Sequence, residues 1–249
     1  MLNGFGTNAD EVARRTAFDS LRALDQESSL VAATSRTTQQ AVDIGRILNT
    51  DVSLATIFPN TTLGNQLKQV AKVIKFNAAT PSLGLARQIF FCQLGGFDTH
   101  QNQVATQASL LQQVSQAVAA FYQSTVELGM DQQVTTFTLS DFGRTLQPAG
   151  TGSGVVGSDH AWGSHHFVVG GAVRGGDFFG VPGPNGSVFP VLQLNGPSDT
   201  DTRGRWIPTA SVEQYAATLA SWYGVGAADI PVVFPNIGRF SVSDLGFMV

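Results

Sequence analysis

The stretch QIFFCQLGGFDTH, residues 88–100, joins an apolar run to two glycines and an Asp-x-His pair. Residues 88–94 predict a short strand that is apolar on both faces, as in a parallel sheet. Asp98 and His100 follow the glycines at once. In open α/β sheets, ligands bind beyond the carboxyl ends of the strands. The stretch therefore predicts a buried strand with polar ligands at its end.

The next part of the chain repeats this pattern. A long amphipathic helix is predicted over 103–128, followed by a second buried strand over 134–139 that runs into SDFGRT, residues 140–145. A strand–helix–strand series implies parallel strands with a right-handed crossover. Asp98 and Asp141 would then lie on the same rim of the sheet. The alternative for Asp141 is that it only caps a turn.

Helical patterns also cover residues 8–49 and 63–76 and a last helix that Ser211 can cap. Residues 167–171 and 188–194 read as further short strands, the second at an edge. We therefore expect an α/β fold with a mostly parallel sheet. The chain shows no clear domain boundary, so we expect one domain over 1–249, with 1–60 as a peripheral helical segment and 61–249 as the core.

Composition excludes several classes of protein. The formal net charge is −4 and the basic residues are scattered, so no nucleic-acid partner is expected. No apolar run is long enough to span a membrane, and the N-terminus lacks the pattern of a signal peptide. The single cysteine, Cys92, cannot form an intrachain disulfide and reads as a small buried hydrophobe.

Three of the four histidines lie in SDHAWGSHH, residues 158–166, and the fourth is His100. Imidazoles and carboxylates close together are what a divalent metal needs. His165 and His166 are adjacent, so only one of them is expected to reach an ion, with His166 the first choice. This donor set predicts one or two ions of Zn, Mn, Mg or Ca. The candidate ligands are Asp98, His100, Asp141, Asp159, His160, His165 and His166.

Arg144 follows Asp141 by three residues and has two interpretations. It can offer a bidentate donor to an anionic oxygen, or it can pair with Asp141 or Asp159 and only brace the loop. No nucleophile motif, phosphate-binding loop or dinucleotide fingerprint is present. Hydroxyl groups flank the candidate ligands at Thr99, Ser140, Thr145 and Ser158.

Several strings in this order resemble the sulfatase-like family catalogued as domain of unknown function 1501. That resemblance covers nearly the whole chain and implies an alkaline phosphatase-like, three-layer α/β/α fold. It also implies a metal-dependent phosphatase- or sulfatase-like activity on a small anionic ester, and export to the periplasm, often through a twin-arginine signal. The strings are FPNTTLGNQLKQVAKVI, GGFDTHQNQ, SDFGRT, SDHAWGSHHFVVGGAVRGGDFFG, RGRWIPT and SVEQYAATLASWYGV.

The chain departs from the family pattern in three ways. His100 follows Asp98 after two residues, whereas the pattern has its histidine after four, where Asn102 stands here. Asp141 resembles the aspartate of the family's Asp-His ligand pair, but Phe142 stands where that pair has its histidine, and Asp159 with His160 is expected to supply what the pair lost. The chain also resembles only the later part of the family fold, without the portion that carries the first metal-binding aspartate and the nucleophile. A partner chain can supply that portion. The alternative to a hydrolase is therefore a non-catalytic, exported metal- or ligand-binding protein, or a fragment, that keeps the scaffold without the nucleophile.

Overall fold

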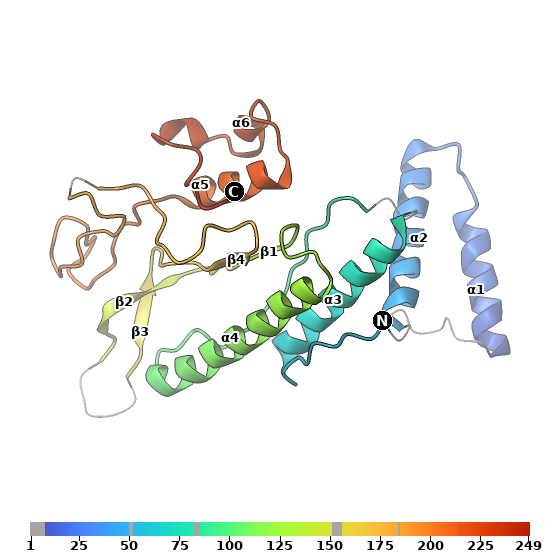
Figure 1. The fold of residues 1–249 in the computed structure, drawn as a ribbon, viewed down its shortest axis with the longest axis horizontal. Coiled ribbons are helices and arrows are strands. Elements are labelled where there is room, and N and C mark those ends of the chain that lie inside the picture. The colour runs from blue at the N-terminus through green and yellow to red at the C-terminus, as the bar shows by residue number, and fades with distance from the viewer. Residues whose placement is uncertain (1–7, 50–51, 82–84, 151–155, 184) are drawn as a thin grey trace. The chain divides into compact units, whose positions relative to one another are not determined.

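The computed structural model describes residues 8–49, 52–81, 85–150, 156–183 and 185–249. Six α-helices, four short strands and a 3-10 helix are assigned within these ranges (Figure 1). The helices are α1 (Ala9–Arg22), α2 (Ser29–Asn49), α3 (Thr62–Ala79), α4 (Gln103–Glu127), α5 (Val212–Tyr223), α6 (Ile230–Val233) and η2 (Ile237–Arg239). The strands are β1 (Thr135–Phe137), β2 (Gly143–Pro148), β3 (Ser158–Ala161) and β4 (Val168–Gly170).

The chain divides into two compact units, one made of residues 1–55 and 68–86 and the other of residues 56–67 and 87–249. The residues of the candidate site all belong to the second unit. The expectation of one domain over 1–249 stays a prediction.

The first unit contains a helical hairpin, as the sequence predicts for residues 8–49. Asn8 caps α1, because its side chain accepts a hydrogen bond from the Glu11 N–H at 2.9 Å. The Ser35 hydroxyl of α2 donates to the Arg22 carbonyl at the end of α1. None of the α1 residues is buried.

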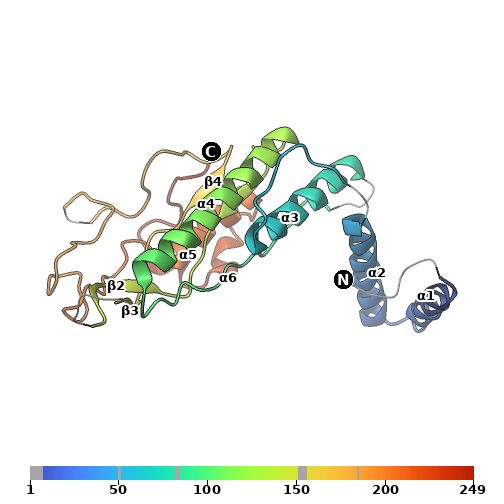
Figure 2. The same cartoon turned by 90° about the horizontal axis from the view of Figure 1, so that it is seen from below.

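The predicted three-layer α/β/α fold with a mostly parallel sheet is wrong. The described residues form two separate sheets, each of two antiparallel strands. β1 pairs with β4, and β2 pairs with β3. The β2–β3 pair lies apart from β4 in both views (Figures 1 and 2). The segments SDFGRT and SDHAWGSHH are thus partly paired as the two strands of a β-hairpin.

The first predicted strand shows why the parallel sheet does not form. A strand that is apolar on both faces needs a layer of helices packed on each face. β1 instead pairs with β4, which follows it in the sequence, and residues 88–94 form no strand. Ile89 and Phe91 are 77% and 85% exposed. The side-chain amide of Gln66 takes the place of a neighbouring strand at Gln93, because it accepts from the backbone N–H and donates to the carbonyl, each at 2.9 Å.

The C-terminal part of the second unit packs around α5. Ser211 begins this helix with a capping box shared with Gln214, which confirms the predicted cap. Ala217 of α5 is buried against Ile230 and Ile237. No described helix has the length and hydropathy of a membrane span, as expected from the sequence.

Candidate metal centre

The β2–β3 hairpin presents His160, which lies opposite Arg144 in the strand register. The neighbouring pair is Gly143 and Ala161. A Cβ on Gly143 would meet the Gly163 carbonyl oxygen at 2.3 Å, so the backbone here requires glycine. The close packing of the hairpin therefore fixes the position of the His160 backbone.

Asp98 and His100 lie on the segment before α4. Thr99, between them, is buried and accepts a hydrogen bond from the Gln107 amide at 3.0 Å. Because the middle residue points inward, both flanking side chains are exposed. The Gly157 N–H donates to the His100 carbonyl at 3.0 Å and joins this segment to the chain just before β3.

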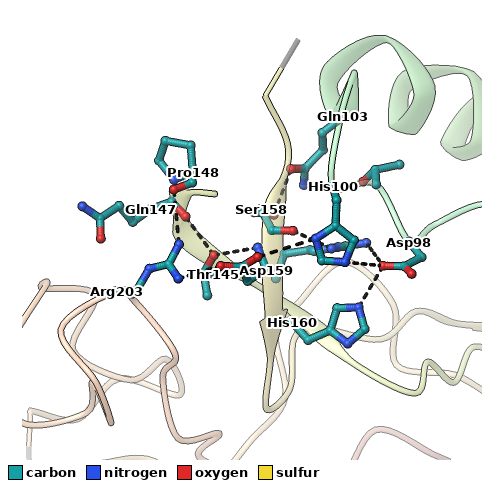
Figure 3. Close-up of polar contacts among 12 residues, drawn as sticks. Asp98, His100, Gln103, Thr145, Gln147, Pro148, Ser158, Asp159, His160 and Arg203 are labelled. Carbon is teal, nitrogen blue, oxygen red and sulfur yellow. Dashed lines mark hydrogen bonds and ion pairs between the residues drawn. The ribbon is translucent and has the colours of Figure 1, made fainter. Parts of the chain in front are cut away.

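Asp98, His100 and His160 form the ligand cluster (Figure 3). Oδ1 of Asp98 lies 2.8 Å from Nε2 of His160 and 3.0 Å from Nε2 of His100. One ligand atom from each side chain lies within 4.8 Å of the others. The three side chains are 48–58% exposed, so solvent and small molecules reach them.

Phe142 supports the imidazole of His160. The two rings stack with centroids 3.9 Å apart and planes 3° from parallel. The guanidinium carbon of Arg144 lies 5.0 Å from the centroid of the same phenyl ring. Phe142 thus limits the rotation of His160 and restricts the direction of its Nε2.

Arg144 connects the two parts of the site. Its Nη2 donates to the Phe97 carbonyl at 2.6 Å and to Asp98 Oδ1 at 3.0 Å, and its Nη1 donates to the Ser158 carbonyl at 2.6 Å. The side chain is 14% exposed. Arg144 therefore braces the site, as in one of the two interpretations from the sequence, although its carboxylate partner is Asp98. Anion binding by Arg144 stays a prediction.

Asp159 lies behind His100, on the side away from Asp98. Its Oδ1 is 3.5 Å from Nδ1 of His100, and its Oδ2 accepts a hydrogen bond from Arg203 at 2.6 Å. A carboxylate at the second nitrogen of a ligating histidine fixes the ring and its tautomer. Asp159 therefore has the place of an orienting group.

Hydrogen bonds keep the two carboxyl groups ionised. The hydrogen bond from His160, followed by that from Arg144, lowers the pKa of Asp98. The hydrogen bond from Arg203 lowers the pKa of Asp159 in the same way. Metal ligands and the groups that orient them must be deprotonated at working pH, and both carboxyl groups meet this condition.

The donor set fits a metal ion of a particular kind. Two imidazole nitrogens and one carboxylate oxygen suit Zn²⁺ and related transition metals, whereas Mg²⁺ and Ca²⁺ prefer oxygen ligands. Three protein ligands also leave coordination positions open. The cluster is therefore suited to one transition-metal ion.

The other predicted ligands lie outside the cluster. Asp141 is exposed in the turn before β2. The His165 ring contacts Phe189 edge to face, and the His166 ring stacks on Tyr215 with centroids 5.5 Å apart. The structure brings together three of the seven predicted residues, with Asp159 beside them. The larger ligand set stays a prediction.

Sequence reasoning missed two supporting residues. Phe142 was noted only for the histidine that it replaces, and Arg203 lies 44 residues from Asp159 along the chain. No local pattern connects an arginine to a carboxylate over such a distance. Phe142 directly precedes β2, whose partner strand carries His160. An aromatic residue in that position is the signal that could have indicated the contact between Phe142 and His160.

The fold and the site define a mixed helical protein with short antiparallel sheets and an exposed Asp/His cluster. Residues 82–187 match the model of the family described as "Protein of unknown function (DUF1501)". The match supports, over this segment, the resemblance seen in the sequence. The segment holds all three residues of the ligand cluster, whereas Arg203 lies beyond it. The placement in the alkaline phosphatase-like superfamily stays a prediction.

Searches of curated proteins and of solved structures found no match to the chain.

We expect Gly157→Ala to disrupt the site. A Cβ at this position would meet the Thr99 carbonyl oxygen at 2.0 Å and the His100 carbonyl carbon at 2.3 Å. The free energy of unfolding should fall by about 1–3 kcal/mol, as overpacking generally costs. Gly175→Ala is the matched control, because its Cβ would meet nothing within 4 Å. Equal stability of both variants in urea unfolding would contradict the close approach.

We expect His166 to make the protein less stable in mild acid. Burial, and secondarily the charge of His165, lowers the pKa of His166 below 6.5. The unfolded chain therefore binds a proton here more readily than the folded protein, and stability falls as pH drops through about 6.5. His166→Phe should show a smaller loss of unfolding free energy between about pH 7.5 and 5.5. An unchanged loss in this variant would show that other groups cause it.

Proposed function

We propose that the protein binds one divalent transition-metal ion through Asp98, His100 and His160 and uses it to hydrolyse phosphate or sulfate esters. The observation that carries the proposal is the convergence of the three ligand atoms within 4.8 Å of one another. These donors come from two segments of the chain that Arg144 joins. An incidental surface cluster would not need such a brace.

When bound, a divalent ion polarises an ester oxygen and activates water for attack. The chain contributes the positions of the groups around it. Asp98, His100 and His160 hold the ion, Asp159 orients His100, and Phe142 supports His160. The exposure of the three ligands gives an anionic ester access to the open coordination positions.

The hydroxyl groups near the cluster favour attack by water over a covalent intermediate. Each of the four that the sequence placed beside the candidate ligands donates a hydrogen bond within the protein. The acceptors are carbonyl and amide oxygens, not a general base that would activate a hydroxyl for attack on an ester. Water therefore adds to phosphorus or sulfur, its oxygen displaces the alcohol, and the alcohol leaves with one of the protons of the water. The four are Thr99 to Phe97 O, Ser140 to Phe142 O, Thr145 to Gln147 O and Ser158 to Gln103 Oε1.

A second candidate function is metal binding without catalysis. The observation that favours it is the wide exposure of the ligands, because catalytic sites generally exclude water to strengthen their electrostatics. In this case the protein keeps the ligand cluster for holding an ion. The two functions share the same site and differ in turnover.

We expect the purified protein to bind about one Zn²⁺ per chain. His160→Ala should weaken binding by more than about 100-fold, since loss of outer-shell groups alone costs 10–100-fold. Competition with a chromophoric chelator measures the affinity. At a free Zn²⁺ concentration of 100 times the Kd, the ion should raise the free energy of unfolding by about 2.7 kcal/mol.

The matched control is His165→Ala, which removes an exposed imidazole that contacts Phe189. It should bind Zn²⁺ like the wild-type protein. If the wild-type protein binds no Zn²⁺, or if His160→Ala binds as tightly as wild type, the metal centre is not formed by this cluster.

We expect the Zn²⁺- or Mn²⁺-loaded protein to hydrolyse an aryl phosphate or an aryl sulfate. A chelator and the His160→Ala substitution should each remove the activity, because both remove the ion. Release of the phenol, followed by absorbance, measures turnover. If the ion binds with the expected stoichiometry but neither ester is turned over, the proposal of a hydrolase is overturned and metal binding remains as the function.

A further inference from the structure

Residues 195–206 form a loop around one partly exposed carboxylate, that of Asp199, and we call them the clamp loop. The Asp199 carboxylate accepts hydrogen bonds from four backbone N–H groups and so fixes the course of the loop. Two residues near its end, Thr202 and Gly204, have left-handed backbone conformations with φ of 75° and 78°. The four donors are Asn195, Asp201, Gly204 and Arg205, at 2.9–3.3 Å.

The clamp loop is attached to the hairpin that carries His160. The backbone N–H groups of Leu146 and Gln147 in β2 donate to the carbonyls of Gly204 and Arg203 at 3.3 and 3.1 Å. A Cβ on Gly204 would meet Cβ of Leu146 at 2.6 Å, so the two backbones are as close as glycine allows. The loop is therefore held in a fixed position against β2.

Two arginines reach from this loop to β3. Arg203 donates from Nη1 to the Asp159 carboxylate at 2.6 Å and from Nη2 to the Pro148 carbonyl at 3.3 Å. Arg205 donates from Nε to the His160 carbonyl at 2.8 Å. One arginine thus holds the side chain behind the ligand cluster, and the other holds the backbone of a ligand (Figure 3 shows Arg203, Asp159 and His100).

Asp159 transmits the effect of Arg203 to the ligand cluster. With one carboxylate oxygen bound to Arg203, its other oxygen faces Nδ1 of His100 at 3.5 Å. The opposite ring nitrogen, Nε2, faces Asp98. A proton held on Nδ1 leaves the Nε2 lone pair free for an ion.

We propose that Arg203 is a positioning residue of the metal centre, which holds Asp159 so that Asp159 keeps the His100 ring and tautomer ready for the ion. This inference rests on the proposed metal function. It extends the site beyond the segment that matches the family model, because Arg203 lies past residue 187. A residue that only braces the hairpin would affect stability without changing the coordination of the ion.

The test compares Arg203→Met, Arg203→Lys and the wild-type protein. We expect Arg203→Met to weaken Zn²⁺ binding about 10-fold or more, within the 10–100-fold range of orienting groups. Arg203→Lys should recover most of this loss, because an ammonium group can still pair with the single Asp159 oxygen. Arg239→Met, at an exposed arginine of η2, is the control and should bind like wild type.

Asp159→Asn tests the same connection between Arg203 and His100 without a substitution in the clamp loop. It should weaken Zn²⁺ binding by a similar factor, and Arg203→Met should add little to it in the double variant, because residues in one network are not additive. The Co²⁺-loaded protein gives an independent readout. Both single variants should change its visible absorption in the same way, since both release His100.

The outcomes separate the two proposals. If the wild-type protein binds no Zn²⁺, the proposed function fails. If wild type binds Zn²⁺ and Arg203→Met binds it equally well with an unchanged Co²⁺ spectrum, this inference alone is overturned. Additive losses in the double variant would also overturn it, because Arg203 would then act by a route that does not include Asp159.

Discussion

The site depends on the largely buried guanidinium of Arg144. Two of its nitrogens donate to the carbonyls of Phe97 and Ser158, which belong to segments that the sequence places far apart. A planar guanidinium with fixed donor directions sets the distance and angle between the two backbones. Asp98 and His160 meet because of this constraint, and the Phe142 ring contacts both the same arginine and the His160 ring.

Helices were predicted well because their signals are local. The spacing of Leu67, Ala71 and Ile74 is enough to indicate the buried face of α3, and Ser211 marks the start of α5. Strand pairing has no such signal. Residues 88–94 have the composition of a buried strand, yet their neighbours in space are decided by which segments pair, and β1 pairs with β4. The parallel sheet was inferred from the order of elements, which does not fix their pairing.

The candidate site was predicted in part. Asp98, His100 and His160 were all on the predicted list of ligands, because histidines beside acids at the ends of apolar runs are a pattern visible in sequence. The sequence could not show that Asp159 orients His100 instead of binding the ion, since a ligand and an orienting group can both be carboxylates. The difference lies in distance, with Oδ1 of Asp98 between two Nε2 atoms and Asp159 facing Nδ1 of His100. No sequence signal indicates Arg203, and its contact with Asp159 can be seen only once the clamp loop is folded.

The contact between Asp98 and His160 spans 62 residues of the chain. An ion shared by these two side chains would close a loop of that length, much as a covalent bridge does. Chain-entropy arguments give such a bridge on the order of 4 kcal/mol through the restriction of the unfolded chain. In a protein with a single cysteine, whose short sheets supply few long-range backbone pairings, metal ligation would thus provide the cross-link that other small folds obtain from disulfides.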